Sequence, residues 1–293
     1  MTNDELIPDN FLGIPEVAPE DADALILPIP LEKTVSYGKG TKNGPRAIIT
    51  ASQQVERYEH ELGYEVDNKI KIATLPFVEF KTDDMEEIQK IIKESAKPWT
   101  DKFLLSLGGE HSIAPALVKA YQEKYLHPAN GGADLSILYL DAHTDMREEW
   151  GGTKWSHACA ARRIQEGGVE NIVWVGVRNT SLSEQPYINQ EQVNYGNKYD
   201  LKKILNQLGK NVYISFDVDV FDVSTMPATG TPEPGGLTWY QVMEIFEAVT
   251  REKNVVGADI AECAPIPTSG FHGYDFLVAK LAFKLIGYKF RKQ

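Results

Sequence analysis

The sequence predicts a three-layer α/β/α fold with a mainly parallel central sheet. Short apolar runs alternate with amphipathic stretches along the whole chain, which is the order expected of strands and helices in such a fold. The chain has 293 residues, of which 42% are hydrophobic, so it can bury one large core. No glycine- and serine-rich linker, repeat or low-complexity segment interrupts the alternation. We therefore expect one domain over residues 1–293.

Seven runs are candidate strands. Most are continuous in Val, Ile, Leu and Phe, which is typical of strands that are covered by helices on both faces of a parallel sheet. The expected strands are Asp23–Ile29, Ile70–Leu75, Phe103–Leu107, Leu135–Leu140, Asn171–Val177, Asn211–Val218 and Val255–Ala261.

The expected helices lie between and after these runs. Residues 84–97 repeat apolar side chains at helical spacing, and residues 238–250 open with a capping-box pair, Thr238 and Gln241. A helix is expected to start near Pro45, and Ser112 is a candidate cap for the helix that follows it. Residues 274–288 are apolar enough to pack on the sheet or on another subunit.

Charge and cysteine content limit the partners and the compartment. The formal net charge of −12 would repel nucleic acids and anionic membranes, so we expect a small cationic or neutral ligand. Cys159 and Cys263 are far apart and fit no C-x-x-C pattern, which favours a reducing cytoplasm. The first residues, MTNDELIPDN, lack the apolar segment of a signal peptide, and no apolar run approaches the ~20 residues that span a bilayer.

Three polar motifs follow expected strands. GGEHS contains His111 after two glycines that permit a tight turn and close backbone approach. His111 by itself would equally suit a buried histidine with satisfied hydrogen bonds. DAHTD places Asp141, His143 and Asp145 at alternate positions, which would share one face if the strand continued through them.

The third motif, SFDVDVFD, delivers Asp217 and Asp219 in the same alternating way. Buried acids are costly unless a cation neutralises them. Asp222, just beyond, could instead accept hydrogen bonds from the backbone of a turn. A solvated polar loop is the alternative for DAHTD taken alone.

Together the three motifs supply four aspartates and two histidines. This oxygen-rich set suits two divalent cations, with Mn²⁺ a natural choice, better than a single structural zinc. Two such ions can activate a shared water at neutral pH. With one hydroxide the site would carry a net charge of −1, which would welcome a cation and resist a phosphate. The predicted ligands are His111, Asp141, His143, Asp145, Asp217 and Asp219.

A fourth motif, GADIAECAP, places Glu262 at the end of an expected strand. A lone glutamate in such a position is more often structural. Next to a two-metal site it gains weight, because a carboxylate pairs in bidentate fashion with a planar guanidinium.

These motifs resemble, in order, those of the ureohydrolase family of arginases and agmatinases. GGEHS, DAHTD and SFDVDVFD match its three metal motifs, and DIAECAP matches its D-x-x-E-x-x-P. ATGTPEPGGLTW, at residues 228–239, and TVSYGKGTKNGPRAI, at residues 34–48, are similar to further family segments. Many members carry Arg where this chain has Gly38.

The resemblance implies an arginase/deacetylase-like fold, two Mn²⁺ per subunit held by the six residues above, and a homo-oligomer, commonly a trimer or hexamer. It also implies that Asp145 holds the bridging hydroxide, that Glu262 binds the substrate guanidinium and that His157 shuttles protons. Family members often have Gly where this chain has Ala158.

The segment MREEW, which follows the second metal motif, bears on the choice of substrate. Arginases bind the α-carboxylate of arginine in this region, whereas Glu148 and Glu149 would repel a carboxylate and favour an amine. Agmatine, cleaved to putrescine and urea, fits best, and N1-aminopropylagmatine fits by the same logic. Arginine, guanidinobutyrate and formimidoylglutamate fit less well. Both glutamates could equally point to solvent.

Three other classes are weighed against this function. A zinc deacetylase of similar fold would carry adjacent histidines, and none of the six histidines here are neighbours. A metallophosphoesterase conflicts with the negative site. A non-catalytic relative is disfavoured because every metal position and Glu262 is intact.

Overall fold

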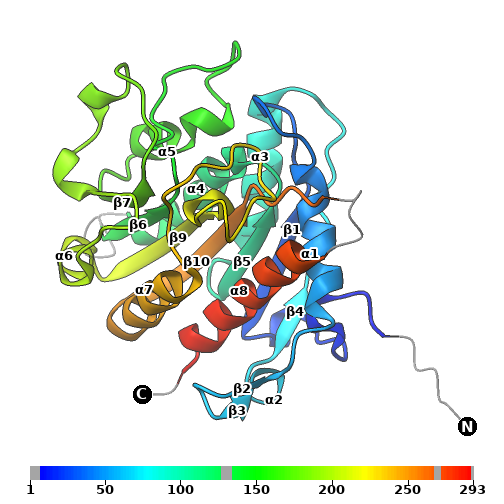
Figure 1. Ribbon diagram of the computed structural model, residues 1–293. Helices are drawn as coiled ribbons and strands as arrows, with labels where there is room; N and C mark the ends of the chain where they lie inside the picture. The colour runs from blue at the N-terminus through cyan, green and yellow to red at the C-terminus, as the bar shows by residue number, and fades with distance from the viewer. Residues whose placement is uncertain (1–6, 127–133, 267–271, 292–293) are drawn as a thin grey trace, which may run out of the picture.

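The central feature of the protein is one eight-stranded, all-parallel sheet. A computed structural model describes residues 7–126, 134–266 and 272–291, and its strands follow the order β4-β1-β5-β10-β9-β6-β7-β8 (Figure 1). The strands are β1 (Ala24–Ile29), β4 (Ile72–Thr74), β5 (Phe103–Gly108), β6 (Leu135–Leu140), β7 (Ile172–Val177), β8 (Val193–Tyr195), β9 (Asn211–Asp217) and β10 (Asn254–Ala261). The predicted parallel sheet and all seven expected strands are confirmed.

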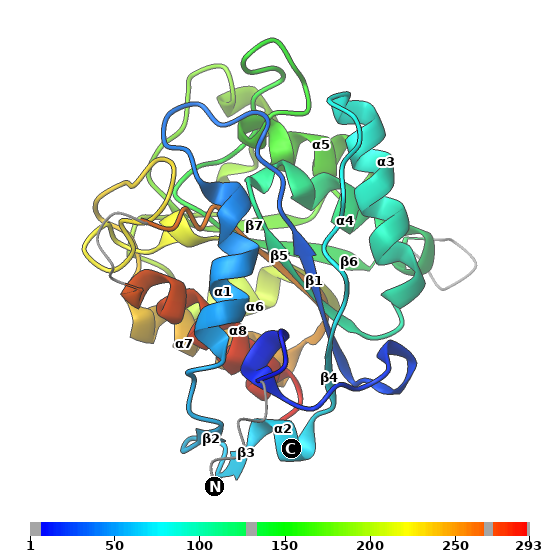
Figure 2. The same cartoon turned by 90° about the vertical axis from the view of Figure 1, so that its right-hand side faces the viewer.

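Helices cover both faces of the sheet, so the three-layer prediction is also confirmed. One face carries α1 (Gly44–Ser52), α6 (Leu201–Gln207), α7 (Trp239–Glu252) and α8 (Gly273–Lys289), and the other carries α3 (Met85–Ala96), α4 (Ala114–Tyr125) and α5 (Ala160–Glu166) (Figures 1 and 2). Thr238 and Gln241 form the expected capping box of α7.

All strands of the sheet except the edge strand β8 contribute side chains to two hydrophobic clusters, one under each helical layer. In β5, Leu105 and Leu107 belong to the cluster beneath α1, α7 and α8, while Leu104 belongs to the cluster beneath α3 and α4. Successive side chains of a strand point to opposite faces. Both sets are apolar, which explains why the strands read as continuous hydrophobic runs.

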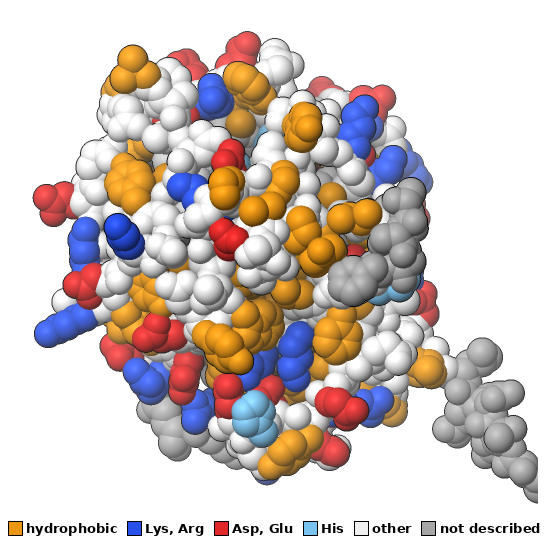
Figure 3. Space-filling view, in the orientation of Figure 1, with side chains coloured by type: hydrophobic (Ala, Val, Ile, Leu, Met, Phe, Trp, Pro, Cys, Tyr) orange, Lys and Arg blue, Asp and Glu red, His pale blue; other side chains and the backbone are white. Residues whose placement is uncertain are grey.

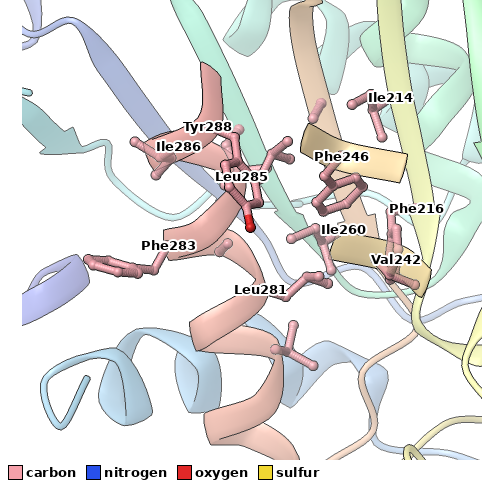
Figure 4. Packing of buried hydrophobic residues seen from close by; sticks show 14 of the residues in the cluster. Ile214, Phe216, Val242, Phe246, Ile260, Leu281, Phe283, Leu285, Ile286 and Tyr288 are labelled. Carbon is pink, nitrogen blue, oxygen red and sulfur yellow. The ribbon is translucent and has the colours of Figure 1, made fainter. Parts of the chain in front are cut away.

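Helix α8 packs against the core of its own chain. Its Leu281 and Leu285 lie on the side of Ile260 of β10 and Phe246 of α7 (Figure 4), and these side chains are fully buried. The sequence left open whether this apolar helix covers the sheet or another subunit. The structure places it on the sheet, next to α1 and α7.

The sequence did not predict several short elements. The strands β2 (Tyr58–Glu59) and β3 (Tyr64–Glu65) form a separate hairpin, followed by α2 (Val66–Lys69), and β8 adds an edge strand. Elements of two to four residues contain too few side chains to show a period.

The expected cap at Ser112 was wrong. A 3-10 turn, His111–Ile113, precedes α4, and the Ser112 hydroxyl donates instead to the Glu110 carboxylate at 2.6 Å.

Two further properties concern the surface. On the face shown in Figure 3, acidic and basic side chains are interspersed with hydrophobic ones. In the part of the chain that the structure describes, no helix combines the length and apolar character needed to cross a bilayer.

The glycines of GGEHS allow the close backbone approach that the sequence suggested. A Cβ at Gly109 would lie 1.9 Å from the Leu31 carbonyl oxygen, and Gly109 N donates to the Ile29 carbonyl at 2.8 Å. Since no side chain fits in that space, glycine is required at position 109, directly after the end of β5.

We expect Gly109→Ala to destabilise the protein by about 1–3 kcal/mol, because the added methyl group pushes the backbone at position 109 away from the backbone of Leu31. Urea denaturation measures the change. Gly230→Ala is the matched control, since its Cβ would meet only ordinary contacts at 3.6 Å. Equal stability of the two variants would contradict the packing argument.

Candidate metal centre and substrate cavity

The predicted site residues meet at the carboxyl ends of four adjacent strands. His111 follows β5, Asp141 follows β6, Asp217 ends β9 and Glu262 follows β10. These strands are neighbours in the order β5-β10-β9-β6, and all are parallel. Their loops therefore leave the same edge of the sheet, where ligand sites of open α/β sheets form.

DAHTD reaches the site by a turn and not by a continued strand. β6 ends at Leu140, and Asp145 adopts a left-handed backbone conformation with φ of 50°. The Ala142 amide donates to Asp219 Oδ1 at 2.9 Å, which ties this loop to the third motif. The expectation of strand alternation was wrong here, because the loop and its hydrogen bonds bring the three side chains together.

The same correction applies to SFDVDVFD. β9 ends at Asp217, and Val218–Val220 form a 3-10 turn. Asp217 caps this turn by accepting the Asp219 amide at 2.8 Å. The two carboxylates thus converge through a capped turn, and Val218, expected in the strand, belongs to the turn.

One metal-capable group is centred on His111. Its Nδ1 lies 3.1 Å from Asp141 Oδ2, 3.4 Å from Asp145 Oδ2 and 3.3 Å from Asp217 Oδ2. All four side chains are nearly or fully buried. Nitrogen and carboxylate oxygen donors at this spacing can hold a divalent cation.

A second metal-capable group is centred on His143. Its Nδ1 lies 3.4 Å from Asp141 Oδ1 and 3.0 Å from Asp219 Oδ2. Asp141 thus turns one carboxylate oxygen to each histidine and belongs to both groups. A carboxylate shared in this way can bridge two cations in a binuclear centre.

The electrostatics of the cluster show an excess of buried negative charge. Burial, with the neighbouring Asp145 and Asp219, raises the pKa of Asp141 to about 6, and burial with Asp219 and Asp141 raises that of Asp217 well above its usual range. Burial alone would lower the pKa of His143, but Asp219 and Asp141 outweigh it and raise the pKa to about 12. Such a donor set fits two divalent cations, which neutralise it without protons.

The side chains behind His111 fix the ring nitrogen that faces the carboxylates. Ser215 Oγ donates to Asp259 Oδ1 at 3.1 Å and lies 2.9 Å from His111 Nε2. Since the serine proton is used on Asp259, Nε2 donates to Ser215 and Nδ1 keeps its lone pair for a metal. Tyr139 donates its hydroxyl to Asp145 Oδ2 at 2.7 Å.

Arg178 is a structural part of the centre that the sequence patterns did not reveal. Its guanidinium donates to the carbonyl oxygens of Asp219 at 2.6 Å, Phe221 at 3.1 Å and Glu233 at 2.8 Å. This ties the third motif to the loop carrying Glu233, whose Oε1 lies 4.0 Å from His143 Nε2. No sequence period marks such a residue, because its partners are carbonyls distant in the chain.

Glu262 lies in the wall of the same cavity in a left-handed conformation, with φ of 64°. Its Oε1 accepts the His111 amide at 2.7 Å. Burial raises the pKa of this carboxyl to about 8. The backbone of Glu262 is strained, and one oxygen of its buried carboxylate accepts a hydrogen bond. The other oxygen can pair with a cation in the cavity.

The cavity above the two groups brings His157 to the site as well. Its lining combines the site residues with loop residues: Val35, Ser36, Tyr37, Gly38, His111, His143, Asp145, Arg147, Trp150, His157, Ala158, Asn179, Thr180, Glu184, Asp217, Asp219, Gly230, Thr231 and Glu262. His157 Nδ1 lies 3.2 Å from Thr34 Oγ1, and Nε2 lies 3.4 Å from Ser36 Oγ.

Glu148 and Glu149 are not among these lining residues. Both are exposed, and the same loop presents Arg147 and Trp150 to the cavity instead, with the Arg147 guanidinium carbon 4.3 Å from the Trp150 ring centre. The contact of Glu148 with substrate stays a prediction.

Two further sequence observations have a structural explanation. Asp222 accepts the Ser224 hydroxyl and the amides of Ser224 at 3.0 Å and Gly235 at 2.6 Å. These bonds lower its pKa to about 2, as the turn alternative expected. Gly38 N donates to Gly230 O at 3.1 Å, and a Cβ at Gly38 would lie 2.8 Å from Gly230 Cα. A side chain at position 38 would therefore push this loop away from Gly230.

The protein has a parallel sheet between two layers of helices and two groups of aspartate and histidine that share Asp141. These features define a binuclear metal-binding α/β protein. The model of the arginase family matches residues 22–287. This chain therefore belongs to the arginase, or ureohydrolase, family, as its motifs indicated.

Individual relatives align over nearly the whole chain. An N(1)-aminopropylagmatine ureohydrolase of Thermus thermophilus is 35% identical, over 92% of this chain and 91% of the relative. An agmatinase of Pyrococcus horikoshii is 34% identical, over 94% and 95%. The crystal structure of an agmatine ureohydrolase of Thermoplasma volcanium superimposes with a TM-score of 0.81 and 29% identity, over 93% and 92%.

The shared Asp141 predicts how metal content responds to substitution. We expect about two divalent cations per wild-type chain, about one in His143→Ala and almost none in Asp141→Ala, because only Asp141 serves both groups. Elemental analysis of gel-filtered protein measures the ratio, and circular dichroism checks folding.

His60→Ala is the matched control. His60 lies between Glu59 and Glu61 in a third group with metal-like spacing, but it is exposed, and the two glutamates pair with Lys284. Its removal should leave the metal content unchanged. An equal loss of metal in His143→Ala and Asp141→Ala would argue against two sites that share Asp141.

Proposed function

We propose that this protein hydrolyses the guanidino group of a small cationic substrate to urea and an amine, with agmatine to putrescine plus urea as the leading reaction. The observation that carries the proposal is the position of Glu262 in one cavity with both metal-capable groups. A guanidinium paired with Glu262 would present its carbon to that centre. The agmatinase and ureohydrolase names of relatives support the same reaction.

The proposed cofactor is a pair of Mn²⁺ ions per subunit. His111, Asp141, Asp145 and Asp217 would hold one ion, and Asp141, His143 and Asp219 the other. When bound, the ions supply a water of lowered pKa as nucleophile and electrostatic stabilisation of developing charge. Donor sets rich in carboxylates favour Mn²⁺ over metals that prefer thiolate ligands.

The protein side chains would act by binding, orientation and proton transfer. Asp145, whose Oδ2 already accepts the Tyr139 hydroxyl, would orient the nucleophile. Glu262 would hold the guanidinium in the plane of its carboxylate, since the two groups are matched forks. His157, which also lines the cavity, would carry a proton to the amine that leaves.

A longer substrate, N1-aminopropylagmatine, is a second candidate. The relative of Thermus thermophilus carries that name. The exposed aromatic side chains of Tyr37 and Trp150 lie at the cavity, where they could pack along an extended polyamine tail.

Arg147 provides a specific reason to include anionic substrates in any test. Because it lines the cavity, it would attract the carboxylate tail of guanidinobutyrate or arginine. Against this, the four aspartates and Glu262 favour a cation overall.

We also propose a cytoplasmic location and a homo-oligomeric state. Both cysteines, Cys159 and Cys263, are free and buried, which suits a reducing compartment. A trimer or hexamer follows from the family resemblance of the sequence.

We expect a panel of guanidino compounds, assayed for urea in the presence of Mn²⁺, to give the highest kcat/KM with a cationic-tailed substrate, either agmatine or N1-aminopropylagmatine. The panel should contain arginine, guanidinobutyrate and formimidoylglutamate. The negative centre should repel their carboxylates. Higher kcat/KM for arginine or guanidinobutyrate would show that Arg147 dominates recognition.

The double variant His143→Ala, Asp219→Ala serves as the inactive control. It should release no urea while keeping the circular dichroism spectrum of the wild type. Unchanged turnover would disprove the assigned centre. Release of acetate from an acetyl-lysine peptide, with about one zinc per chain, would instead favour the deacetylase class.

A further inference from the structure

Glu110 is a buried carboxylate to which the proposed reaction assigns no part. It is 0% exposed, and no salt bridge of the described residues includes it. Its Oε2 accepts the amides of Lys33 at 2.9 Å and Thr34 at 2.7 Å. Its Oε1 accepts the hydroxyls of Thr34 at 2.9 Å and Ser112 at 2.6 Å.

These four donors stabilise the buried carboxylate and fix the segment that begins at Lys33. That segment precedes α1, and Val35 to Gly38 form part of the cavity wall. Glu110 therefore anchors one wall of the cavity from beneath. The anchored residue nearest to His157 is Thr34.

Thr34 Oγ1 has three neighbours. It donates to Glu110 Oε1 at 2.9 Å, accepts the His157 amide at 3.0 Å and lies 3.2 Å from His157 Nδ1. A hydroxyl has one proton and two acceptor lone pairs. Thr34 donates its proton to Glu110 and uses one lone pair to accept the His157 amide. A hydrogen bond between Thr34 and Nδ1 therefore requires that Nδ1 carries a proton.

The consequence concerns the other ring nitrogen. If Nδ1 carries the proton of the neutral ring, Nε2 has the free lone pair, and Nε2 lies on the side of Ser36, a cavity residue. A proton shuttle needs a basic nitrogen that faces its substrate. Ser156 Oγ also lies near Nδ1, but at the longer distance of 3.4 Å.

We propose that Glu110 and Thr34 are positioning residues for His157. Glu110 sets the direction of the Thr34 hydroxyl, and Thr34 fixes the orientation and the tautomer of the ring, so that Nε2 exchanges protons in the cavity. This inference rests on the proposed function, because it assumes that His157 transfers a proton during turnover.

The first test compares Thr34→Val with Thr34→Ser. Valine keeps the shape of threonine but cannot accept from Nδ1, so kcat for urea release should fall roughly tenfold or more, as for loss of an oriented hydrogen bond, with little change in KM. Serine keeps the hydroxyl and should restore most of kcat. Glu110→Gln, which replaces one acceptor oxygen by an amide donor, should also lower kcat.

Ser156→Ala is the matched control, because it removes the other hydroxyl near Nδ1 and should leave kcat close to that of the wild type. Metal content and thermal unfolding, measured for every variant, separate positioning from misfolding. Wild-type kcat in folded Thr34→Val, failure of Thr34→Ser to restore activity, or a loss in Ser156→Ala equal to that in Thr34→Val would overturn the proposal.

A second readout does not depend on turnover. ¹⁵N NMR of histidine-labelled protein, loaded with diamagnetic Mg²⁺ at alkaline pH, reports which ring nitrogen lacks a proton, and His157→Ala assigns the signal. We expect the unprotonated nitrogen to be Nε2 in the wild type and a mixture of tautomers in Thr34→Val. An unprotonated Nδ1 in the wild type would overturn the inference. If the tautomer is as expected but His157→Ala turns over normally, the assigned role of His157 in the proposed function fails.

Discussion

The protein is organised around mutual repulsion of buried carboxylates. Asp141, Asp145, Asp217 and Asp219 gather with two histidines at one edge of the sheet, and burial together with their neighbours raises the pKa of Asp141 and Asp217. Only positive charge placed among them makes this arrangement favourable. The parallel strands, the tight turns and the cavity serve to hold these groups where divalent cations neutralise them.

Loops, not strands, give the site its geometry. Asp145 and Glu262 both adopt left-handed backbone conformations, which cost free energy and persist where surrounding contacts hold them. Arg162 N donates to the Asp145 carbonyl at 3.1 Å, and Glu262 N donates to the Gly109 carbonyl at 2.8 Å. Arg178 holds another part of the site by donating to carbonyls of the third motif and of the loop that carries Glu233. The Glu110 carboxylate does the same for the segment that contains Thr34. Hydrogen bonds between distant segments thus maintain a strained centre on a rigid sheet.

The fold was largely predictable because strands buried on both faces leave a plain signal. The run Phe103 to Leu107 reads as continuously apolar, since alternate side chains enter different clusters. The hairpin β2–β3 has two residues per strand and carries no such signal. The metal-capable residues were predictable by their spacing, but the reason given for their convergence was wrong, because β6 and β9 end before the second acid of each motif.

The sequence by itself determined the parallel three-layer fold, the family and the set of acids and histidines, because each depends on residue type and local spacing. Only the tertiary structure decided that Asp141 is shared by two groups, that Arg147 and Trp150 line the cavity while Glu148 is exposed, and that Thr34 contacts His157. These relations join segments up to 123 residues apart. They depend on how parallel strands align their ends, which no local pattern of residues records.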